Sequence, residues 1–242
     1  MRFPVNGSIV ADDDAAAIRY FRLDSFLPSI CPGDIRQAIA DNPAGEELVL
    51  EINSPGGSLY SGFEMYSILA GAGCTVVAEV QSIAGSAASL LLPAASRVVC
   101  SPVGQVMIHL PSTSTEGNEI AHRQNLQMLQ ASTESIINAY AKKCKKKCSR
   151  DSLRRKMANE TFLTAQEAME IGLVDEILGE ETPPADPRTV MNSAGAGFDL
   201  GKLRAAYAAA VLQDGGTPPP ETDPFDHERA RALLALETAR FI

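Results

Sequence analysis

Strand-like and helical segments alternate over the first half of this chain, and that alternation constrains its fold more than any other feature. Residues 48–52 form a largely apolar run typical of a buried strand, and an Asn-Ser-Pro-Gly-Gly turn ends it. Helical spacing follows over 59–70, a β-branched strand pattern over 75–80, and a second helical segment over 86–92 that Pro93 ends. Strands joined through helices are mostly parallel, so the pattern predicts an α/β fold.

The remaining residues add short strands and one long helix. Strands are predicted at 97–100, 106–108 and 173–177, and an early one at 18–23. Apolar residues recur at near-helical spacing from 119 to about 147, which predicts a single long helix after the compact part of the chain. Such a helix either packs on the core or mediates assembly, and its sequence favours neither role.

The composition changes after Gly179. Pro- and Gly-rich stretches typical of linkers alternate there with patterns of short helices at 200–212 and 226–241. We therefore expect one domain over residues 1–179 and a flexible tail over residues 180–242 that lies outside it.

The chain is acidic overall but carries one basic segment. Its formal net charge is −9 at pH 7, which argues against general binding of DNA or RNA. Residues 142–156 are nevertheless rich in Lys and Arg, and only Asp151 opposes them within the cluster. This segment is predicted either to be a solvated helix end or to dock an acidic partner.

Cysteine use and hydropathy indicate the compartment. The five cysteines are scattered, which argues against a disulfide framework. Cys144 and Cys148 lack a second pair of ligands, so no zinc site is predicted. The most apolar stretch, 84–95, is too short to span a bilayer, and the N-terminal residues lack the apolar core of a signal peptide. We expect a cytoplasmic protein that does not bind membranes.

Three short motifs, in one order, supply the parts of a serine hydrolase. They are the turn at 52–57, then Gly85-Ser86-Ala87-Ala88-Ser89, then Met107-Ile108-His109. A serine between very small residues lets a carbonyl approach the main chain, and a histidine can serve as its base. If Ser86 begins a helix, the Ala87 N–H points at a developing oxyanion, and Gly57 can supply a second donor.

Together these motifs resemble those of the Clp-type serine peptidases, the family of the Clp protease proteolytic subunit. A fourth motif agrees: Glu160-Thr161-Phe162-Leu163-Thr164-Ala165, then Glu167-Ala168 and Gly172-Leu173-Val174-Asp175. The similarity covers roughly residues 8–178. It implies that residues 1–179 are a Clp-type protease domain with a repeated β-β-α superhelix, similar to that of enoyl-CoA hydratases (crotonases). The long helix would protrude from this domain as a handle.

The resemblance also assigns roles to residues. Ser86 is the expected nucleophile, whereas Ser89 fits the local pattern but lies one helical turn out of register. His109 is the expected general base and then general acid. Glu160 is expected to orient the imidazole, with Asn159 as a weaker candidate. No metal or organic cofactor is implied.

Within the family, the short Ser86–His109 spacing, the Gly-Ser-Ala-Ala-Ser form and the long tail resemble the viral, prophage-encoded branch. Those members resemble head maturation proteases, which cut scaffold and capsid precursors inside a forming procapsid. The resemblance implies an ATP-independent endopeptidase in the host cytoplasm or procapsid, assembled as stacked rings, commonly a tetradecamer. Three alternatives stay open: a housekeeping ATP-dependent subunit that works with an unfoldase, a crotonase-type acyl-CoA enzyme, and a catalytically dead assembly protein.

Overall fold

The computed structural model describes residues 1–179 and five later positions: 201, 204, 205, 207 and 208. Its contacts divide the chain into two compact units. The first comprises Met1–Ile9 and Ile30–Glu180, and the second includes Val10–Ser29 and the five later positions. The tail predicted over 180–242, with its linkers and short helices, otherwise lies outside the described residues.

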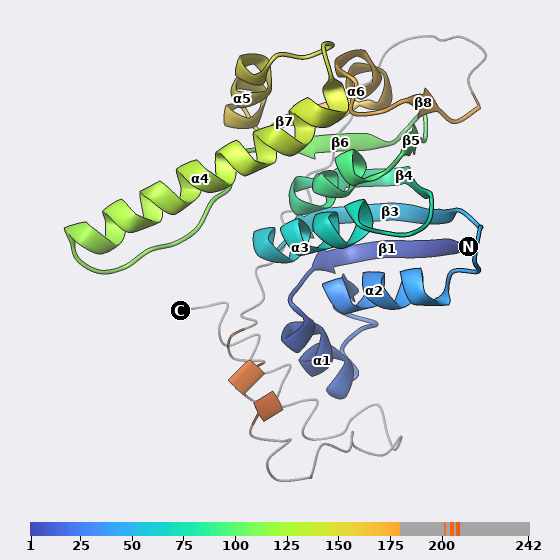
Figure 1. Cartoon of the computed structure of the whole chain (residues 1–242). Coiled ribbons are helices and arrows are strands. Elements are labelled where there is room, and N and C mark those ends of the chain that lie inside the picture. The colour runs from blue at the N-terminus through green and yellow to red at the C-terminus, as the bar shows by residue number, and fades with distance from the viewer. Residues whose placement is uncertain (180–200, 202–203, 206, 209–242) are drawn as a thin grey trace. The chain divides into compact units, whose positions relative to one another are not determined.

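One sheet forms the centre of the first unit (Figure 1). Its strands follow the order β2-β1-β3-β4-β5-β8, while β6 pairs with β4 and with β7. The β1–β3, β3–β4, β4–β5, β4–β6 and β5–β8 pairings are parallel, and β6–β7 is antiparallel. The α/β prediction with mostly parallel strands is therefore confirmed. The strands are β1 (Arg2–Ile9), β2 (Ser29–Ile30), β3 (Leu48–Gly57), β4 (Val76–Gly85), β5 (Arg97–Cys100), β6 (Gln105–Ile108), β7 (Thr161–Thr164) and β8 (Glu176–Ile177).

Helices pack on this sheet through apolar faces. Leu50 and Val80 of the central strands are fully buried, in one hydrophobic core with Met65 of α3, Leu91 of η1 and Ile137 of α4. Burying side chains of this kind contributes about 1.5–3 kcal/mol each. The helices of the first unit are α2 (Pro32–Asp41), α3 (Leu59–Ala70), the 3₁₀ helix η1 (Ser86–Ala94), α4 (Glu119–Cys144), α5 (Arg150–Ala158) and α6 (Ala165–Ile171).

Several element boundaries differ from the predictions; strand β4, for example, runs on to Gly85, beyond the predicted end at residue 80. Strand β3 continues through the glycine turn to Gly57, because Ser8 and Ile9 of β1 still pair with Gly56 and Gly57. The helix predicted to stop at Pro93 continues to Ala94, because a proline in the last turn removes only one hydrogen bond. The strand predicted over 173–177 is reduced to Glu176–Ile177.

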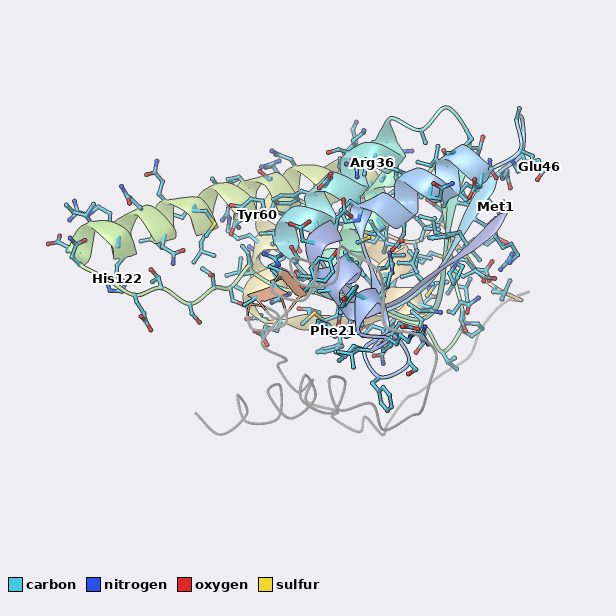
Figure 2. The ribbon with its side chains drawn as sticks, turned by 90° about the horizontal axis from the view of Figure 1, so that it is seen from below. Met1, Phe21, Arg36, Glu46, Tyr60 and His122 are labelled. Atoms are coloured by element: carbon cyan, nitrogen blue, oxygen red, sulfur yellow. The ribbon has the colours of Figure 1, made fainter. Side chains whose placement is uncertain are left out.

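Helix α4 is the long helix that the sequence predicts, and its two halves differ. It has 26 residues and stops at Cys144 because the next residue, Lys145, adopts a φ of +54°. Its buried residues all lie from Ser132 onward. The first half is exposed and includes Ile120 and Leu126, which are 65% and 55% exposed. His122 lies toward the outer end of this half (Figure 2).

The second unit is built on helix α1, Asp12–Tyr20. The strand predicted over 18–23 is therefore wrong. Three aspartates in the first turn complement the positive end of the helix dipole, and the alanines that follow favour helix. Arg204 pairs with the buried Asp14 (Nη2 to Oδ2, 2.8 Å), and Tyr207 packs edge-on against Tyr20.

Candidate active site

The segment around Ser86 is a sharp turn from strand to helix. Strand β4 ends at Gly85 and η1 begins at Ser86, which adopts a φ of +48°. A left-handed conformation costs a residue with a Cβ roughly 1–2 kcal/mol, so the surrounding structure must hold it in place. The glycine turn at the end of β3 packs closely here: a Cβ on Gly56 would lie 2.6 Å from the Cβ of Ser86.

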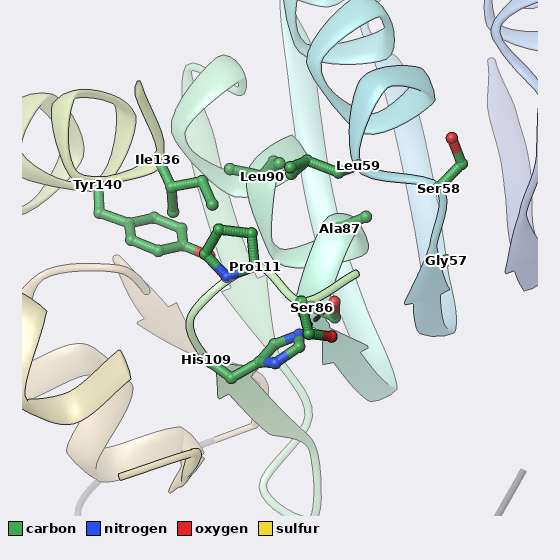
Figure 3. Close-up of a pocket in the computed structure, with 11 residues that line it drawn as sticks. Gly57, Ser58, Leu59, Ser86, Ala87, Leu90, His109, Pro111, Ile136 and Tyr140 are labelled. Carbon is green, nitrogen blue, oxygen red and sulfur yellow. Dashed lines mark hydrogen bonds between the residues drawn. The ribbon is translucent and has the colours of Figure 1, made fainter. Parts of the chain in front are cut away.

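His109 reaches Ser86 because two parallel strands end at the same edge of the sheet. Strand β6 pairs with β4 in a register that places Met107 beside Gly85. Ser86 follows the last residue of β4, and His109 follows the last residue of β6. Both residues therefore leave the same edge of the sheet and meet in the site. Ser86 Oγ and His109 Nε2 are 2.7 Å apart, a hydrogen-bond distance (Figure 3). If Nδ1 carries the ring proton, Nε2 accepts from the hydroxyl, which is the arrangement of a nucleophile and its base.

The carboxylate expected to orient His109 is brought near it by strand pairing but is not hydrogen-bonded to it. Ile108 pairs with Thr161 in the antiparallel β6–β7 ladder, so Glu160 comes directly before the strand that flanks His109. Glu160 adopts a φ of +46° and its side chain is exposed. Among the described residues, His109 makes no hydrogen bond to a carboxylate; its Nε2 lies against Ser86 Oγ. Asn159, the C-cap of α5, is also exposed.

A pocket of about 240 Å³ adjoins the serine–histidine pair. Gly57 and Ala87, the two expected oxyanion donors, line it together with Ser86 and His109. Gly57 has a φ of +147°, and a Cβ there would lie only 2.1 Å from the carbonyl oxygen of Ile9, so no side chain fits. The rest of the lining combines two serines, Ser58 and Ser112, with larger side chains: Leu59, Leu90, Pro111, Ile136 and Tyr140 (Figure 3). The apolar part of this lining suits an apolar side chain of a bound peptide.

Ser89, the alternative nucleophile, does not line the pocket. It is fully buried, and its Oγ lies 2.5 Å from the carbonyl oxygen of Ser86 and 2.6 Å from the hydroxyl of Tyr140. Both of its bonding partners are protein groups, so Ser89 is poorly placed to attack a substrate. Sequence reasoning missed the role of Tyr140, which it counted only as an apolar position of the long helix.

Other possible reactive centres are weak within the described part of the chain. No group there of three or more His, Cys, Asp and Glu side chains is arranged to hold a metal ion. All five cysteines are free, and burial raises the pKa of the Cys100 thiol to about 11 and that of Cys144 to about 12. These two thiols are therefore protonated and unreactive near neutral pH. No helix among the described residues is long and apolar enough to cross a membrane.

Comparison with known proteins identifies the family. The profile of the Clp protease family matches residues 38–181, a segment that holds the glycine turn, Ser86, His109 and Glu160. The chain belongs to the Clp protease family. The resemblance inferred from the sequence motifs is thereby confirmed.

Relatives in two bacterial species support this assignment. The chain is 30% identical over 163 residues to the ATP-dependent Clp protease proteolytic subunit of Porphyromonas gingivalis (strain ATCC BAA-308 / W83), covering 65% of this chain and 70% of that protein. Proteins of the same name from Bacteroides fragilis strains ATCC 25285 and YCH46 are each 34% identical over 140 residues. That match covers 55% of this chain but only 65% and 61% of the two B. fragilis proteins, less than two thirds of either.

Proposed function

We propose that this member of the Clp protease family is a serine endopeptidase with Ser86 as nucleophile and His109 as general base. One observation carries the proposal: Ser86 Oγ lies 2.7 Å from His109 Nε2 at the wall of a pocket. Gly57 and Ala87 line the same pocket, which supports their main-chain N–H groups as the oxyanion hole.

In the proposed reaction, His109 Nε2 takes the proton of Ser86 Oγ as the oxygen attacks the carbonyl carbon of the scissile peptide. The negative charge that develops on the carbonyl oxygen is held by the N–H groups of Gly57 and Ala87. The imidazolium then gives its proton to the leaving amine, which breaks the C–N bond and leaves an acyl-Ser86 ester. Water, deprotonated by His109, hydrolyses that ester and restores the hydroxyl.

Glu160 is the proposed orienting carboxylate. Its support is position: it directly precedes β7, which pairs with β6, the strand that ends next to His109. A carboxylate accepting from Nδ1–H would hold the ring so that Nε2 faces Ser86 and would stabilise the imidazolium. The exposed side chain of Glu160 must turn toward His109 to do this, and we propose that assembly or substrate binding brings about that turn.

We further propose that the protein works as a homo-oligomer of stacked rings, with the tetradecamer as the expected form. The exposed first half of α4 supports this, because Ile120 and Leu126 present apolar side chains on a helix that extends beyond the core. The proposed location is the cytoplasm of a bacterial host, or the procapsid if a phage encodes the chain.

For the biological role, we propose ATP-independent maturation of a phage head by cleavage of scaffold or capsid precursors. The short Ser86–His109 spacing and the chain that continues past the family match at residue 181 support this role. A second role, as the proteolytic subunit that an ATP-driven unfoldase feeds, is favoured by the names of the bacterial relatives.

The decisive test of the enzyme class is labelling with a fluorophosphonate, read by intact mass. Wild type and Ser89→Ala should gain one phosphonyl group, and Ser86→Ala should gain none. Labelling lost only in Ser89→Ala would make Ser89 the nucleophile. An unlabelled wild type that forms rings of the expected size would support the catalytically dead assembly protein. An unlabelled wild type that binds an acyl-CoA would support the crotonase-type enzyme.

The two biological roles differ in their need for ATP. Active wild type, not treated with the fluorophosphonate, should be incubated with a folded, scaffold-like coiled-coil protein, with and without ATP and a bacterial Clp unfoldase. Cleavage without ATP supports the maturation role, whereas cleavage that requires ATP and the unfoldase supports the housekeeping role.

A further inference from the structure

Two buried hydroxyl groups connect helix α4 to the main chain of Ser86. The Ser89 Oγ donates to the carbonyl oxygen of Ser86 at 2.5 Å, and it lies 2.6 Å from the Tyr140 hydroxyl. A serine hydroxyl has one proton, and here that proton goes to the carbonyl. Tyr140 must therefore donate to Ser89, which gives the bonds one direction: from Tyr140 to Ser89, and from Ser89 to Ser86.

Burial makes these bonds effective. Ser89 is fully buried and Tyr140 is 2% exposed, so water does not compete for either hydroxyl. Burial also raises the pKa of Tyr140 above its usual range, so the phenol keeps its proton over the whole pH range in which proteases are assayed. The donor is thus present under all working conditions.

The carbonyl that Ser89 holds belongs to the same peptide unit as the N–H of Ala87. A peptide group is planar and trans, so its C=O and N–H point in opposite directions. Fixing the direction of the Ser86 carbonyl therefore fixes the direction of the Ala87 N–H, a proposed oxyanion donor. It also restrains the ψ rotation of Ser86, a residue whose φ of +48° already requires support from its surroundings.

We infer that Tyr140 and Ser89 are positioning residues, which orient the Ala87 N–H by holding the Ser86 carbonyl. The inference deepens the proposed serine peptidase activity and rests on it. Neither hydroxyl touches the substrate. The Tyr140 ring, which lines the pocket beside Ile136, has a second role as part of the wall (Figure 3). Tyr140 belongs to the second half of α4, so this helix helps to set the geometry of the nucleophile. The first half of the same helix is exposed and free to contact another copy.

The test separates the hydroxyl of Tyr140 from its ring. Tyr140→Phe keeps the ring in the pocket wall and removes only the donor. Ser89→Ala removes the link to the carbonyl, and Ser89→Thr restores a hydroxyl. Tyr66→Phe is a matched control on α3, because the Tyr66 hydroxyl makes no hydrogen bond within the part of the chain that the structure describes. All variants are compared in the assembled full-length protein, with a fluorogenic peptide that wild type cleaves.

Tyr140→Phe and Ser89→Ala should each lower kcat on the order of tenfold, as loss of a buried hydrogen bond implies, with KM changed less than about twofold. The affinity for a peptide boronate, which mimics the tetrahedral intermediate, should fall by the same factor as kcat/KM. The double variant should be no worse than Ser89→Ala alone, and Ser89→Thr should recover part of the loss. Tyr66→Phe should behave as wild type.

Wild-type kcat in Tyr140→Phe, or a loss confined to KM, would overturn the inference, since either result leaves Tyr140 only as pocket wall. A second readout does not depend on activity: the crystal structure of Ser89→Ala. It should show the peptide between residues 86 and 87 rotated away from its wild-type direction. An unmoved peptide refutes the positioning role. A rotated peptide in a protein that no fluorophosphonate labels upholds the positioning while the proposed enzyme class fails.

Discussion

Two turns leave neighbouring parallel strands at the same edge of the sheet, and they reach left-handed conformations by different means. The turn that ends β3 uses glycine, with φ values of +104° at Gly56 and +147° at Gly57. The turn that follows β4 uses a serine, with a φ of +48° at Ser86. Glycine adopts such angles at little cost, whereas serine does not.

The difference indicates what each turn is for. The glycine turn has no room for side chains, because a Cβ at Gly57 would collide with the main chain of Ile9 and one at Gly56 with Ser86. The serine turn bears strain that a glycine would relieve, so the side chain itself must be required there. Strain of this kind is common at functional sites. It is not sufficient alone, since Arg22 and Lys145 also have positive φ values and lie outside the pocket lining.

The largest effect should come from removing the hydroxyl of the strained turn. Ser86→Ala is expected to reduce peptide hydrolysis by about 10⁴-fold or more, because the nucleophile is lost while binding remains. The measurement is turnover of the fluorogenic peptide, with thermal unfolding showing an intact fold. Activity within tenfold of wild type would contradict the interpretation that the strained turn is kept because the serine hydroxyl is required for catalysis.

The next largest effect should come from adding a side chain to the glycine turn at the end of β3. In Gly57→Ala the new Cβ would lie 2.1 Å from the Ile9 carbonyl oxygen, so the strand ends must separate. We expect a loss of about 2–4 kcal/mol in the free energy of unfolding and about a hundredfold in kcat, because one oxyanion donor shifts. Urea titration and peptide turnover measure the two losses.

Gly45→Ala is the control for this variant. Gly45 also has a positive φ, +85°, but a Cβ there would meet nothing within 4 Å. It should therefore cost only the strain of the backbone angle, about 1 kcal/mol, with unchanged turnover. Equal destabilisation of the two variants would mean that close packing against Ile9 is unimportant.

A third turn extends the comparison, because Glu160 also adopts a left-handed φ of +46°. If its carboxylate orients His109, Glu160→Gln should lower kcat by roughly 10- to 100-fold with little change in KM, since the imidazolium loses its stabilising charge. Asn159→Ala should leave turnover unchanged. The opposite pattern, with a loss only at Asn159, would transfer the orienting role to that residue.

The sequence predicts the parts of this molecule that depend on local pattern. The strand–turn–helix order, the long helix and the pairing of Ser86 with His109 follow from periodicity, turn residues and the family motifs. Partners from distant elements were not predictable. The basic segment 142–156 has few opposing charges within itself, yet Arg150 and Arg154 pair with Glu134 and Lys143 pairs with Asp175.

The same limit explains what was missed at the site. Ser89 looked like a second candidate nucleophile, because its hydroxyl has the right neighbours in sequence. Only the packing of α4 against η1 reveals that Tyr140 engages this hydroxyl. The side-chain direction of Glu160 is a second example, because it depends on a turn whose left-handed angle no local pattern announces.

The smallest effect should be the most informative about strain. Ser86→Gly and Ser86→Ala both lack the hydroxyl, so both should be inactive, but only glycine adopts a φ of +48° without a penalty. Gly loses more backbone entropy on folding than Ala, which opposes the gain by about 0.5–1 kcal/mol. The relieved strain of roughly 1–2 kcal/mol should leave Ser86→Gly at least as stable as Ser86→Ala, and more stable by up to about 1.5 kcal/mol. The midpoints of urea unfolding give the comparison. A Ser86→Ala protein clearly more stable than Ser86→Gly would mean that the serine turn is not strained.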